Sequence, residues 1–281
     1  MIPTRGVVYM IFDKRPLRER SNGLPPGSYI NELNYSSRWA GEVLKLPVTL
    51  MAEQDMPLKE MGVDLSNFNS IQLYDASPFH DPIKTNGFLR KLYLYDWSPY
   101  DETLYLDTDA FPIGDEHPVN PDYPHQPPPD ITGFEYPFRM ASAHGLAMAH
   151  DSFQMGRLEK RADGKVFTPY PAMFRTLHYY LPGCEHIPLF NGGVIFFRKG
   201  FPGLKEVVDV ARSICHSMWC DDQLALTVAA ELRRFTIFPL AERVWNCRDF
   251  REPHFLPWWG VRILHNPQWF RNWLLSTGER K

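Results

Sequence analysis

Short apolar runs alternate with helical segments along the first hundred residues, and this alternation constrains the fold more than any other feature. The runs are rich in β-branched and aromatic residues, as buried strands are. Between them, apolar residues recur at helical spacing. The alternation predicts an α/β protein with a mostly parallel sheet covered on both faces, whose ligands lie beyond the carboxyl ends of the strands. We expect strands at Gly6–Phe12, Leu46–Met51, Ser70–Tyr74 and Thr103–Leu106, and helices at Tyr29–Lys45 and Pro82–Trp97.

A second block of predicted structure follows a proline-rich stretch, Pro112–Pro129. We interpret that stretch as an irregular excursion and not as a domain linker, because strand-like sequence resumes at Phe138. The chain has 26 prolines, about twice the usual share of roughly 5%, so long regular helices should be few. The whole chain, 1–281, is expected to form a single domain. In the second block we expect strands at Phe138–Ala143 and Val194–Phe197, and helices at Leu204–Ser217 and Asp222–Arg234.

The composition excludes several classes of protein. Thirty lysines and arginines against 33 aspartates and glutamates give a net charge of −3, with no positive excess to attract nucleic acid. The longest stretch without charged residues, His186–Phe197, is far shorter than the roughly 20 apolar residues of a transmembrane segment. Charged residues follow Gly6–Phe12 where a signal peptide would have small ones, so we interpret that run as a strand. Four cysteines without a CxxC pair make a poor disulfide framework, and we expect a cytoplasmic protein.

Tryptophan, leucine and arginine are mixed near the C-terminus, from Trp258 to Leu275. Such a run could seat the protein on a membrane surface as a peripheral contact. Core packing is the more ordinary explanation, and we favour it.

Two carboxylates end the fourth predicted strand, in the run Leu104-Tyr-Leu-Asp107-Thr108-Asp109. In an extended chain, side chains two residues apart point to the same side. A hard divalent cation such as Mg²⁺ or Mn²⁺ would hold such a pair together and share it with a bound diphosphate. The alternative is a solvated strand end. Lys91, sixteen residues before Asp107 on the preceding predicted helix, could approach those phosphates, although an exposed helix lysine is the commoner case.

Polar residues also flank the later predicted elements. Asn191 and two glycines, Gly192 and Gly193, precede the predicted strand at Val194. Glycine lets a ligand approach the backbone closely, and an asparagine amide can hydrogen-bond to sugar hydroxyl groups. The alternative there is an ordinary turn. Asp221, Asp222 and Gln223 open a predicted helix, where either aspartate could be only a helix cap. His265 ends the strand-like run Val261–His265, and a lone histidine is more often structural than a ligand.

Together and in this order, these features resemble the glycogenin-like and lipopolysaccharide galactosyltransferase-like glycosyltransferases of the GT-A fold. The resemblance covers almost the whole chain. It rests on motifs that occur here in the same order as in the family. It implies a mixed, mostly parallel sheet, a nucleotide-binding half at about 1–115 and an acceptor and sugar half at about 130–281. The most specific motifs are the Lys91 to Asp107-Thr108-Asp109 spacing, Phe190-Asn-Gly-Gly-Val194, Asp222-Gln223 and Trp245-Asn246.

The resemblance also implies the roles of individual residues. Asp107, Asp109 and His265 resemble the ligands of Mn²⁺ or Mg²⁺, with Thr108 between the two carboxylates and Lys91 in contact with the donor. A nucleotide donor would lie over the first strand, with Tyr9, Ile11 and Asp13 near its base and ribose. The residues that would surround the transferred sugar are Asn191, Gly193, Asp222 and Gln223. The candidate catalytic groups among them are the side chains of Asn191, Asp222 and Gln223.

The implied reaction moves a sugar from a nucleotide diphosphate, with UDP favoured as the nucleotide, to an acceptor, with retention of anomeric configuration. The acceptor, a glycan, lipid or protein, would be bound by variable loops at Pro112–Pro129 and Ser152–Tyr180.

This chain departs from the family pattern at two places. The usual ending after the histidine is replaced by Asn266-Pro-Gln-Trp269, so the lysine that meets the diphosphate is missing, and Arg262 or Arg271 are the candidates to replace it. The residues Lys14-Arg15-Pro16 stand where the family has its usual residue after the first strand, so the identity of the donor's nucleotide base is left open.

Two other classes compete with this interpretation. Haloacid-dehalogenase-like phosphatases also end a strand with DxD and use its first aspartate as a nucleophile, but on the first strand and followed by Gly-Thr. Here the motif lies on the fourth predicted strand and continues into Ala110-Phe-Pro. A non-catalytic member of the fold that binds a nucleotide sugar or a glycan would keep nearly the same residues.

Overall fold

The computed structural model describes residues 4–12, 28–75, 87–113, 133–151, 179–182, 189–217, 221–247 and 261–265. Seven strands form one sheet in the order β3-β2-β1-β4-β7-β6-β8, in which only β7 runs opposite to the others. The predicted mostly parallel sheet is thus confirmed. The strands of this sheet are β1 (Arg5–Ile11), β2 (Val48–Glu53), β3 (Ser70–Tyr74), β4 (Glu102–Leu106), β6 (Leu146–His150), β7 (Phe190–Arg198) and β8 (Phe238–Leu240).

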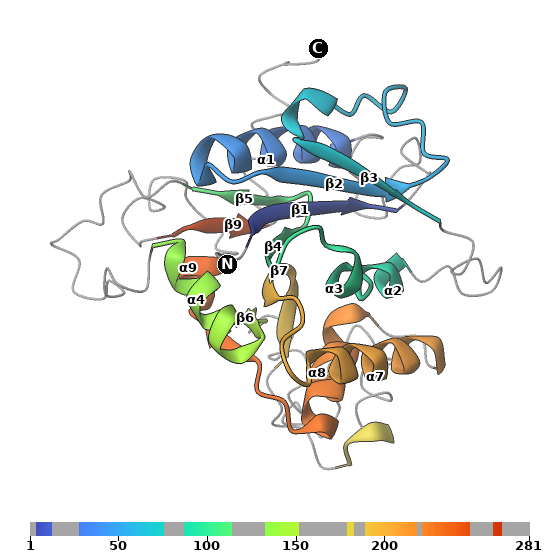
Figure 1. Ribbon diagram of the computed structural model, residues 1–281, viewed down its shortest axis with the longest axis vertical. Coiled ribbons are helices and arrows are strands. Elements are labelled where there is room, and N and C mark those ends of the chain that lie inside the picture. The colour runs from blue at the N-terminus through green and yellow to red at the C-terminus, as the bar shows by residue number, and fades with distance from the viewer. Residues whose placement is uncertain are drawn as a thin grey trace, which may run out of the picture.

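A second, two-stranded antiparallel sheet lies beside the first, where the orange-red β9 meets the green β5 in Figure 1. It joins β5 (Ala110–Pro112) to β9 (Ile263–His265), two segments far apart in the sequence. The helices are α1 (Ser28–Leu44), α2 (Gly87–Lys91), α3 (Leu94–Trp97), α4 (Glu135–His144), α7 (Leu204–Ser217), α8 (Asp222–Arg233) and α9 (Glu242–Trp245), with a 3₁₀ turn η1 at Leu65–Asn67.

Helices cover both faces of the large sheet because alternate residues of each central strand point to opposite sides. Val8 and Met10 of β1 belong to one apolar cluster, which is completed by α2, α3, α7 and α8. Val7 and Tyr9 belong to the other, which is completed by α1, α4 and α9. Figure 1 shows α7 and α8 packed side by side below β7, with α1 on the far side of β1 and β2.

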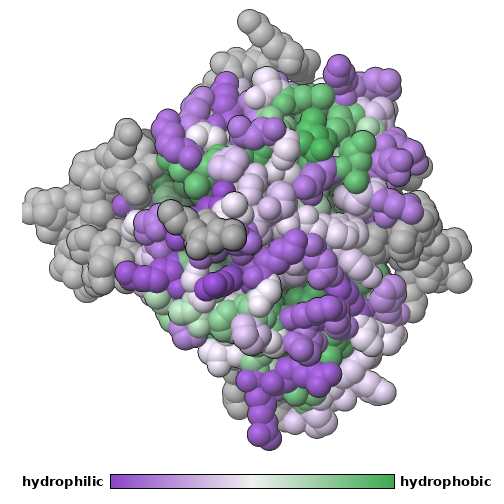
Figure 2. Space-filling view, viewed as in Figure 1, coloured by the Kyte–Doolittle hydropathy of each residue, from purple (hydrophilic) through white to green (hydrophobic). Residues whose placement is uncertain are grey.

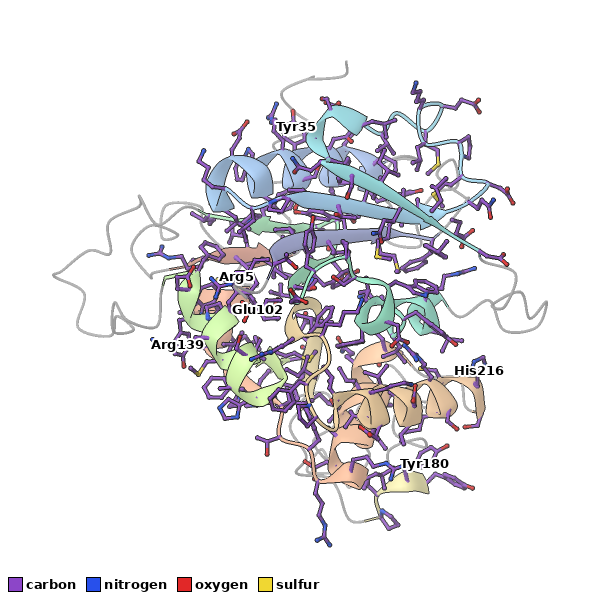
Figure 3. The ribbon with its side chains drawn as sticks, viewed as in Figure 1. Arg5, Tyr35, Glu102, Arg139, Tyr180 and His216 are labelled. Carbon is purple, nitrogen blue, oxygen red and sulfur yellow. The ribbon has the colours of Figure 1, made fainter. Side chains whose placement is uncertain are left out.

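A charged cluster ties β1, β4 and α4 together at the amino end of β4. The guanidinium of Arg5 contacts the carboxylate of the buried Glu102 and both carboxylate oxygens of Glu135, and it lies over the ring of Phe138. Ser142 donates a hydrogen bond to the other carboxylate oxygen of Glu102. Arg5 and Glu102 lie next to each other beside α4 in Figure 3.

The predicted strand at Phe138–Ala143 is wrong, because these residues belong to α4. Phe138 and Ala141, three residues apart, both bury their side chains on one face of that helix, which is helical and not strand spacing. The strand of this region, β6, begins only at Leu146, after the helix ends at Gly145 with φ of 83°.

The predicted continuous helix Pro82–Trp97 is also wrong in its described part. Leu92 and Tyr93 form a turn between α2 and α3. Arg212 of α7 donates a hydrogen bond of 2.8 Å to the carbonyl oxygen of Leu92, which in a continuous helix would accept from Asp96 four residues later. The helix is therefore interrupted by a side chain from another element.

Most other elements are confirmed with small shifts. Ser70–Tyr74 and Leu204–Ser217 have the predicted bounds, and the first long helix runs Ser28–Leu44. The strand predicted from Leu46 begins at Val48, and the strand predicted from Val194 begins at Phe190, so Asn191 and both glycines lie inside β7.

The edge strand β3 has two exposed apolar residues, Ile71 at 39% and Leu73 at 56% exposure. Figure 2 shows hydrophobic surface in this upper part of the molecule. Among the described helices, none combines the length and the apolar character that crossing a membrane requires.

Candidate active site

One edge of the sheet collects the ends of several strands. The carboxyl ends of the parallel strands β1, β4 and β6 meet there with the start of the antiparallel β7. The chain turns to opposite sides of β1 to form β2 and β4, so this edge also has the change of strand order at which open α/β sheets bind ligands. Polar residues that follow β4 and β6 or begin β7 are therefore brought together.

Asp107 and Asp109 lie in the turn between β4 and β5, with Thr108 half-buried between them. His265 joins them because β9 pairs with β5 so that His265 lies opposite Ala110, the residue after Asp109. One ligand atom from each of Asp107, Asp109 and His265 lies within 4.8 Å of the other two. His265 Nε2 is 3.5 Å from Asp109 Oδ1 and 3.9 Å from Asp107 Oδ2. Two carboxylates and an imidazole are a donor set that Mn²⁺ or Mg²⁺ accepts.

Gly193 of β7 lies directly against the side chains of His265 and Asp107. A Cβ at Gly193 would lie 2.1 Å from Cε1 and 2.6 Å from Nε2 of His265, and 2.9 Å from Oδ2 of Asp107. Any other residue would displace the atoms that would hold the ion. The close packing of backbone, imidazole and carboxylate fits a cation site.

Lys91 ends α2 and is buried, at 7% exposure, so it is not the exposed helix lysine that composition alone would suggest. Its Nζ lies 2.8 Å from Asp107 Oδ1 and 3.6 Å from Asp222 Oδ2, and donates to the carbonyl oxygen of Gly192 at 3.2 Å. Burial alone would lower the pKa of Lys91, but the charges of Asp107 and Asp222 raise it above its ordinary value. Lys91 is therefore a fixed positive charge in the site.

The two aspartates that open α8 have separate roles. Asp221 is the N-cap and accepts a hydrogen bond of 2.8 Å from the backbone N–H of Leu224. Asp222 turns toward Lys91, and a Cβ at Gly192 would lie 2.4 Å from its Oδ2. Burial raises the pKa of Asp222, and the charge of Lys91 partly offsets this. Burial and the neighbouring charge of Asp222 raise the pKa of Asp221 to about 7.

Two amides and a buried carboxylate complete this side of the site. The side-chain oxygens of Asn191 and Gln223 accept from the backbone N–H groups of Gly193 and Gly192, at 2.8 and 3.0 Å. Their amide nitrogens both donate to Asp151 Oδ2, at 3.1 and 3.4 Å. Each amide therefore bridges β7 to Asp151.

Asp151 is a site residue that the sequence analysis missed. It follows β6 as Asp107 follows β4, so an apolar strand ending in aspartate is the signal that could have found it. The strand predicted from Phe138 begins eight residues before β6, so it does not end at Asp151.

Two further residues hold the predicted ligands in place and were not assigned a role from sequence. Tyr105 Oη donates a hydrogen bond of 2.6 Å to Asp107 Oδ1, as its position two residues earlier on the same face of β4 allows. Asn246 Oδ1 lies 2.6 Å from His265 Nδ1.

Some predicted residues are not brought to this cluster. Tyr9 is fully buried in the cluster under α1, with its hydroxyl 2.6 Å from Ser36 Oγ, and Ile11 is buried in the same cluster. Their backbone lies at the carboxyl end of β1, and their contact with a donor remains a prediction. Arg262 is buried. Asp13, Arg271, most of both predicted acceptor loops and the C-terminal tryptophan run lie outside the described residues.

No protein-family model and no curated protein sequence matches the chain. Solved structures do match. The apo structure of WbbM, a bifunctional glycosyltransferase, superposes on 95% of this chain and 46% of its own, with a TM-score of 0.51 and 12% identity. The apo form of mouse xyloside xylosyltransferase 1 superposes on 94% of this chain and 97% of its own, with a TM-score of 0.51 and 10% identity. The galactosyltransferase LgtC, in complex with donor and acceptor sugar analogs, has a TM-score of 0.48 at 14% identity, over 92% of this chain and 86% of its own.

The fold is that of the GT-A glycosyltransferases. The predicted fold class is thereby confirmed, and this chain spans about half the length of WbbM and almost all of the xylosyltransferase.

Within this GT-A fold, the site gathers acidic side chains around the buried Lys91. Lys91 Nζ lies 2.8 Å from Asp107 Oδ1 and 3.6 Å from Asp222 Oδ2, and Asp109 lies in the same group as Asp107 and His265. Carboxylates gathered this closely suit a divalent cation.

Proposed function

We propose that this protein is a metal-dependent glycosyltransferase that moves a sugar from a nucleotide diphosphate, with UDP the favoured nucleotide, to an acceptor. The observation that carries the proposal is the convergence of Asp107, Asp109 and His265 within 4.8 Å, next to the buried Lys91. Two carboxylates and an imidazole suit a divalent ion, and a fixed ammonium beside them suits a diphosphate. The shared fold with glycosyltransferases supports the same reaction class.

Asp107, Asp109 and His265 would hold Mn²⁺ or Mg²⁺. When bound, the ion supplies Lewis-acid stabilisation of the negative charge that grows on the leaving diphosphate. Lys91 adds positive charge at the same place, and its raised pKa keeps it protonated at neutral pH.

The groups proposed to surround the sugar include Asp222, whose Oδ2 lies 3.6 Å from Lys91 Nζ. Asp222, Asn191 and Gln223 offer a carboxylate and two amides, which can hydrogen-bond to hydroxyl groups. The lack of a Cβ at Gly192 and Gly193 lets the side chains of Asp222 and His265 lie close to the backbone of β7. Because Asp151 fixes both amides, these side chains are oriented before a ligand binds.

Three finer statements belong to the same proposal. The reaction proceeds with retention, by attack on the face from which the diphosphate leaves. The acceptor is a glycan, a lipid or a protein. The protein works in the cytoplasm.

A thermal-shift panel of nucleotides and nucleotide sugars, with and without Mn²⁺, tests the proposal. A ligand that binds only the folded state raises the melting temperature, by an amount set by its concentration and Kd. We expect UDP and a UDP-sugar to stabilise the protein with Mn²⁺ and to lose this effect in EDTA. A panel in which no nucleotide gives a Mn²⁺-dependent shift contradicts the proposal.

Product analysis distinguishes the competing classes. Release of free sugar, or its transfer, from the stabilising donor indicates an enzyme. Tight binding without release indicates a non-catalytic binding protein. Robust Mg²⁺-dependent hydrolysis of a generic phosphoester would instead indicate a phosphatase of the haloacid-dehalogenase type.

A further inference from the structure

Asn246 belongs to a motif, Trp245-Asn246, that the proposed chemistry does not use directly. Its side chain is fully buried at 0% exposure, and its Oδ1 lies 2.6 Å from Nδ1 of His265, which is itself only 3% exposed. His265 Nε2 points the other way, toward Asp109 and Asp107. The two ring nitrogens of His265 thus face two different partners.

The backbone around Asn246 and His265 is held by three hydrogen bonds between the two segments. Arg262 N donates to Val244 O at 2.7 Å, Cys247 N to Ile263 O at 2.9 Å, and His265 N to Cys247 O at 3.0 Å. On its other side His265 is paired with Ala110 of β5. The backbone therefore fixes the position of the imidazole, while the group that faces Nδ1 determines which ring nitrogen carries the proton.

The other polar atom of Asn246, Nδ2, is buried and has no hydrogen-bond partner among the described residues. A buried amide group without a partner destabilises a protein, so an asparagine at this place is costly to the fold. Leucine, of similar size, would avoid that cost, which points to a role for the bond that Asn246 does make.

We propose that Asn246 is the positioning residue of the metal site: it accepts the Nδ1 proton of His265 and so keeps the lone pair of Nε2 directed at the ion position. A carbonyl-type oxygen can only accept, which assigns the proton to Nδ1. Histidine ligands are oriented in this way by partners behind them, and losing such a partner weakens metal affinity about 10–100-fold. This inference rests on the proposed function, because it requires the metal site.

Two variants of Asn246 separate the positioning role from a structural one. Asn246→Leu removes the acceptor and keeps the size, whereas Asn246→Asp keeps an acceptor opposite Nδ1. For Mn²⁺ added to the metal-free protein and followed by calorimetry, we expect Asn246→Leu to weaken the Kd about 10–100-fold and Asn246→Asp to restore it. Asn34→Leu is the matched control, because Asn34 is hydrogen-bonded to Gly62 and Asp64 and to no site residue. Its Mn²⁺ affinity should equal that of the wild type.

The ring protons give a readout that does not depend on activity. In metal-free protein at pH 8, ¹⁵N spectra of the His265 ring, identified by their absence in His265→Gln, should show the proton on Nδ1 in the wild type. In Asn246→Leu the proton should move to Nε2, where the carboxylates of Asp107 and Asp109 can accept it.

Three outcomes overturn the inference. The first is equal Mn²⁺ affinity in the wild type and Asn246→Leu, which leaves the proposed function standing. The second is a proton on Nε2 in the wild type. The third is a wild-type protein that binds no Mn²⁺, which removes the proposed metal dependence at the same time. Thermal melting of each variant confirms that it is folded.

Discussion

At the amino end of β4, Glu102 is buried against the guanidinium of Arg5 and the hydroxyl of Ser142. At the carboxyl end of the same strand, Asp107 shares the single ammonium of Lys91 with Asp222 and lies close to Asp109. The first end matches its buried negative charge with a positive one. The second end collects carboxylates that repel one another.

The difference between the two ends of β4 predicts that one end contributes mainly to folding stability and the other mainly to ligand binding. A buried carboxylate with a partner is satisfied within the protein, so its removal should act on folding. Carboxylates gathered closely repel one another, and a bound divalent cation would reduce that repulsion. Changes at the carboxyl end should therefore affect ligand binding more than folding, and changes at the amino end should do the reverse.

Asp109→Asn is expected to have the largest effect. It removes one charge from the proposed ligand set but keeps the shape of the side chain, so Mn²⁺-dependent nucleotide binding and turnover should fall at least ~100-fold. Because it also reduces repulsion near Asp107, the melting temperature without metal should not fall. Isothermal titration with Mn²⁺ and nucleotide, together with thermal melting, checks both. Unchanged turnover in this variant would remove the metal hypothesis.

Gly193→Ala tests the same end by shape instead of charge. The new methyl group would lie within 2.1 Å of the His265 ring, so the ring must move away from its position. We expect Mn²⁺ affinity to fall about 10–100-fold. Gly41→Ala is the matched control, since the nearest atom to its Cβ would be 3.8 Å away in ordinary contact. Equal metal affinity in Gly193→Ala and wild type would show that the glycine is not needed for the site.

The residues that could be predicted from sequence are those whose signal is local. Asp107 and Asp109 stand out because a run of apolar residues ends in them, and helix α7 because its apolar spacing is regular. The burial of Lys91 could not be predicted in this way, because its partners lie in the turn after β4 and in α8. The contact between Asn246 and His265 depends on two segments nineteen residues apart that hydrogen-bond to each other, which no local pattern encodes.

The break between α2 and α3 teaches the same lesson for the fold. The apolar spacing of Phe88, Leu89, Leu92 and Tyr95 is helical, but the spacing contains no sign of Arg212, which binds the carbonyl of Leu92 from α7. The strand wrongly placed at Phe138 shows the converse, because aromatic and apolar residues suit both a strand and a helix face. Tertiary contacts decide in both cases.

Glu102→Gln tests the balanced end. It leaves Arg5 paired with Glu135 but removes the buried charge opposite its Nε, so the free energy of unfolding should fall by about 1–2 kcal/mol. Mn²⁺ affinity should not change. Glu135→Gln is the control, because that carboxylate is 84% exposed and its loss should cost less than about 1 kcal/mol. Urea unfolding of both variants, with a metal titration, makes the comparison. A loss of metal affinity in Glu102→Gln would show that the two ends of β4 are not independent.

Asp221→Asn should have the smallest effect and sharpens the comparison inside the acidic end itself. Burial raises the pKa of Asp221 to about 7, above the value of about 3.9 expected in the unfolded chain, so the folded state holds its proton more tightly. Unfolding free energy should therefore decrease as pH rises from about 4 to about 7, the window in which the unfolded chain has already lost the proton.

Asparagine can still cap α8 through its side-chain oxygen, so the variant removes the titration and keeps the cap. In urea unfolding with EDTA at pH 5 and pH 7.5, we expect the variant to lose less stability between the two pH values than the wild type. An equal or larger loss in the variant would mean that Asp221 is ionised throughout this range.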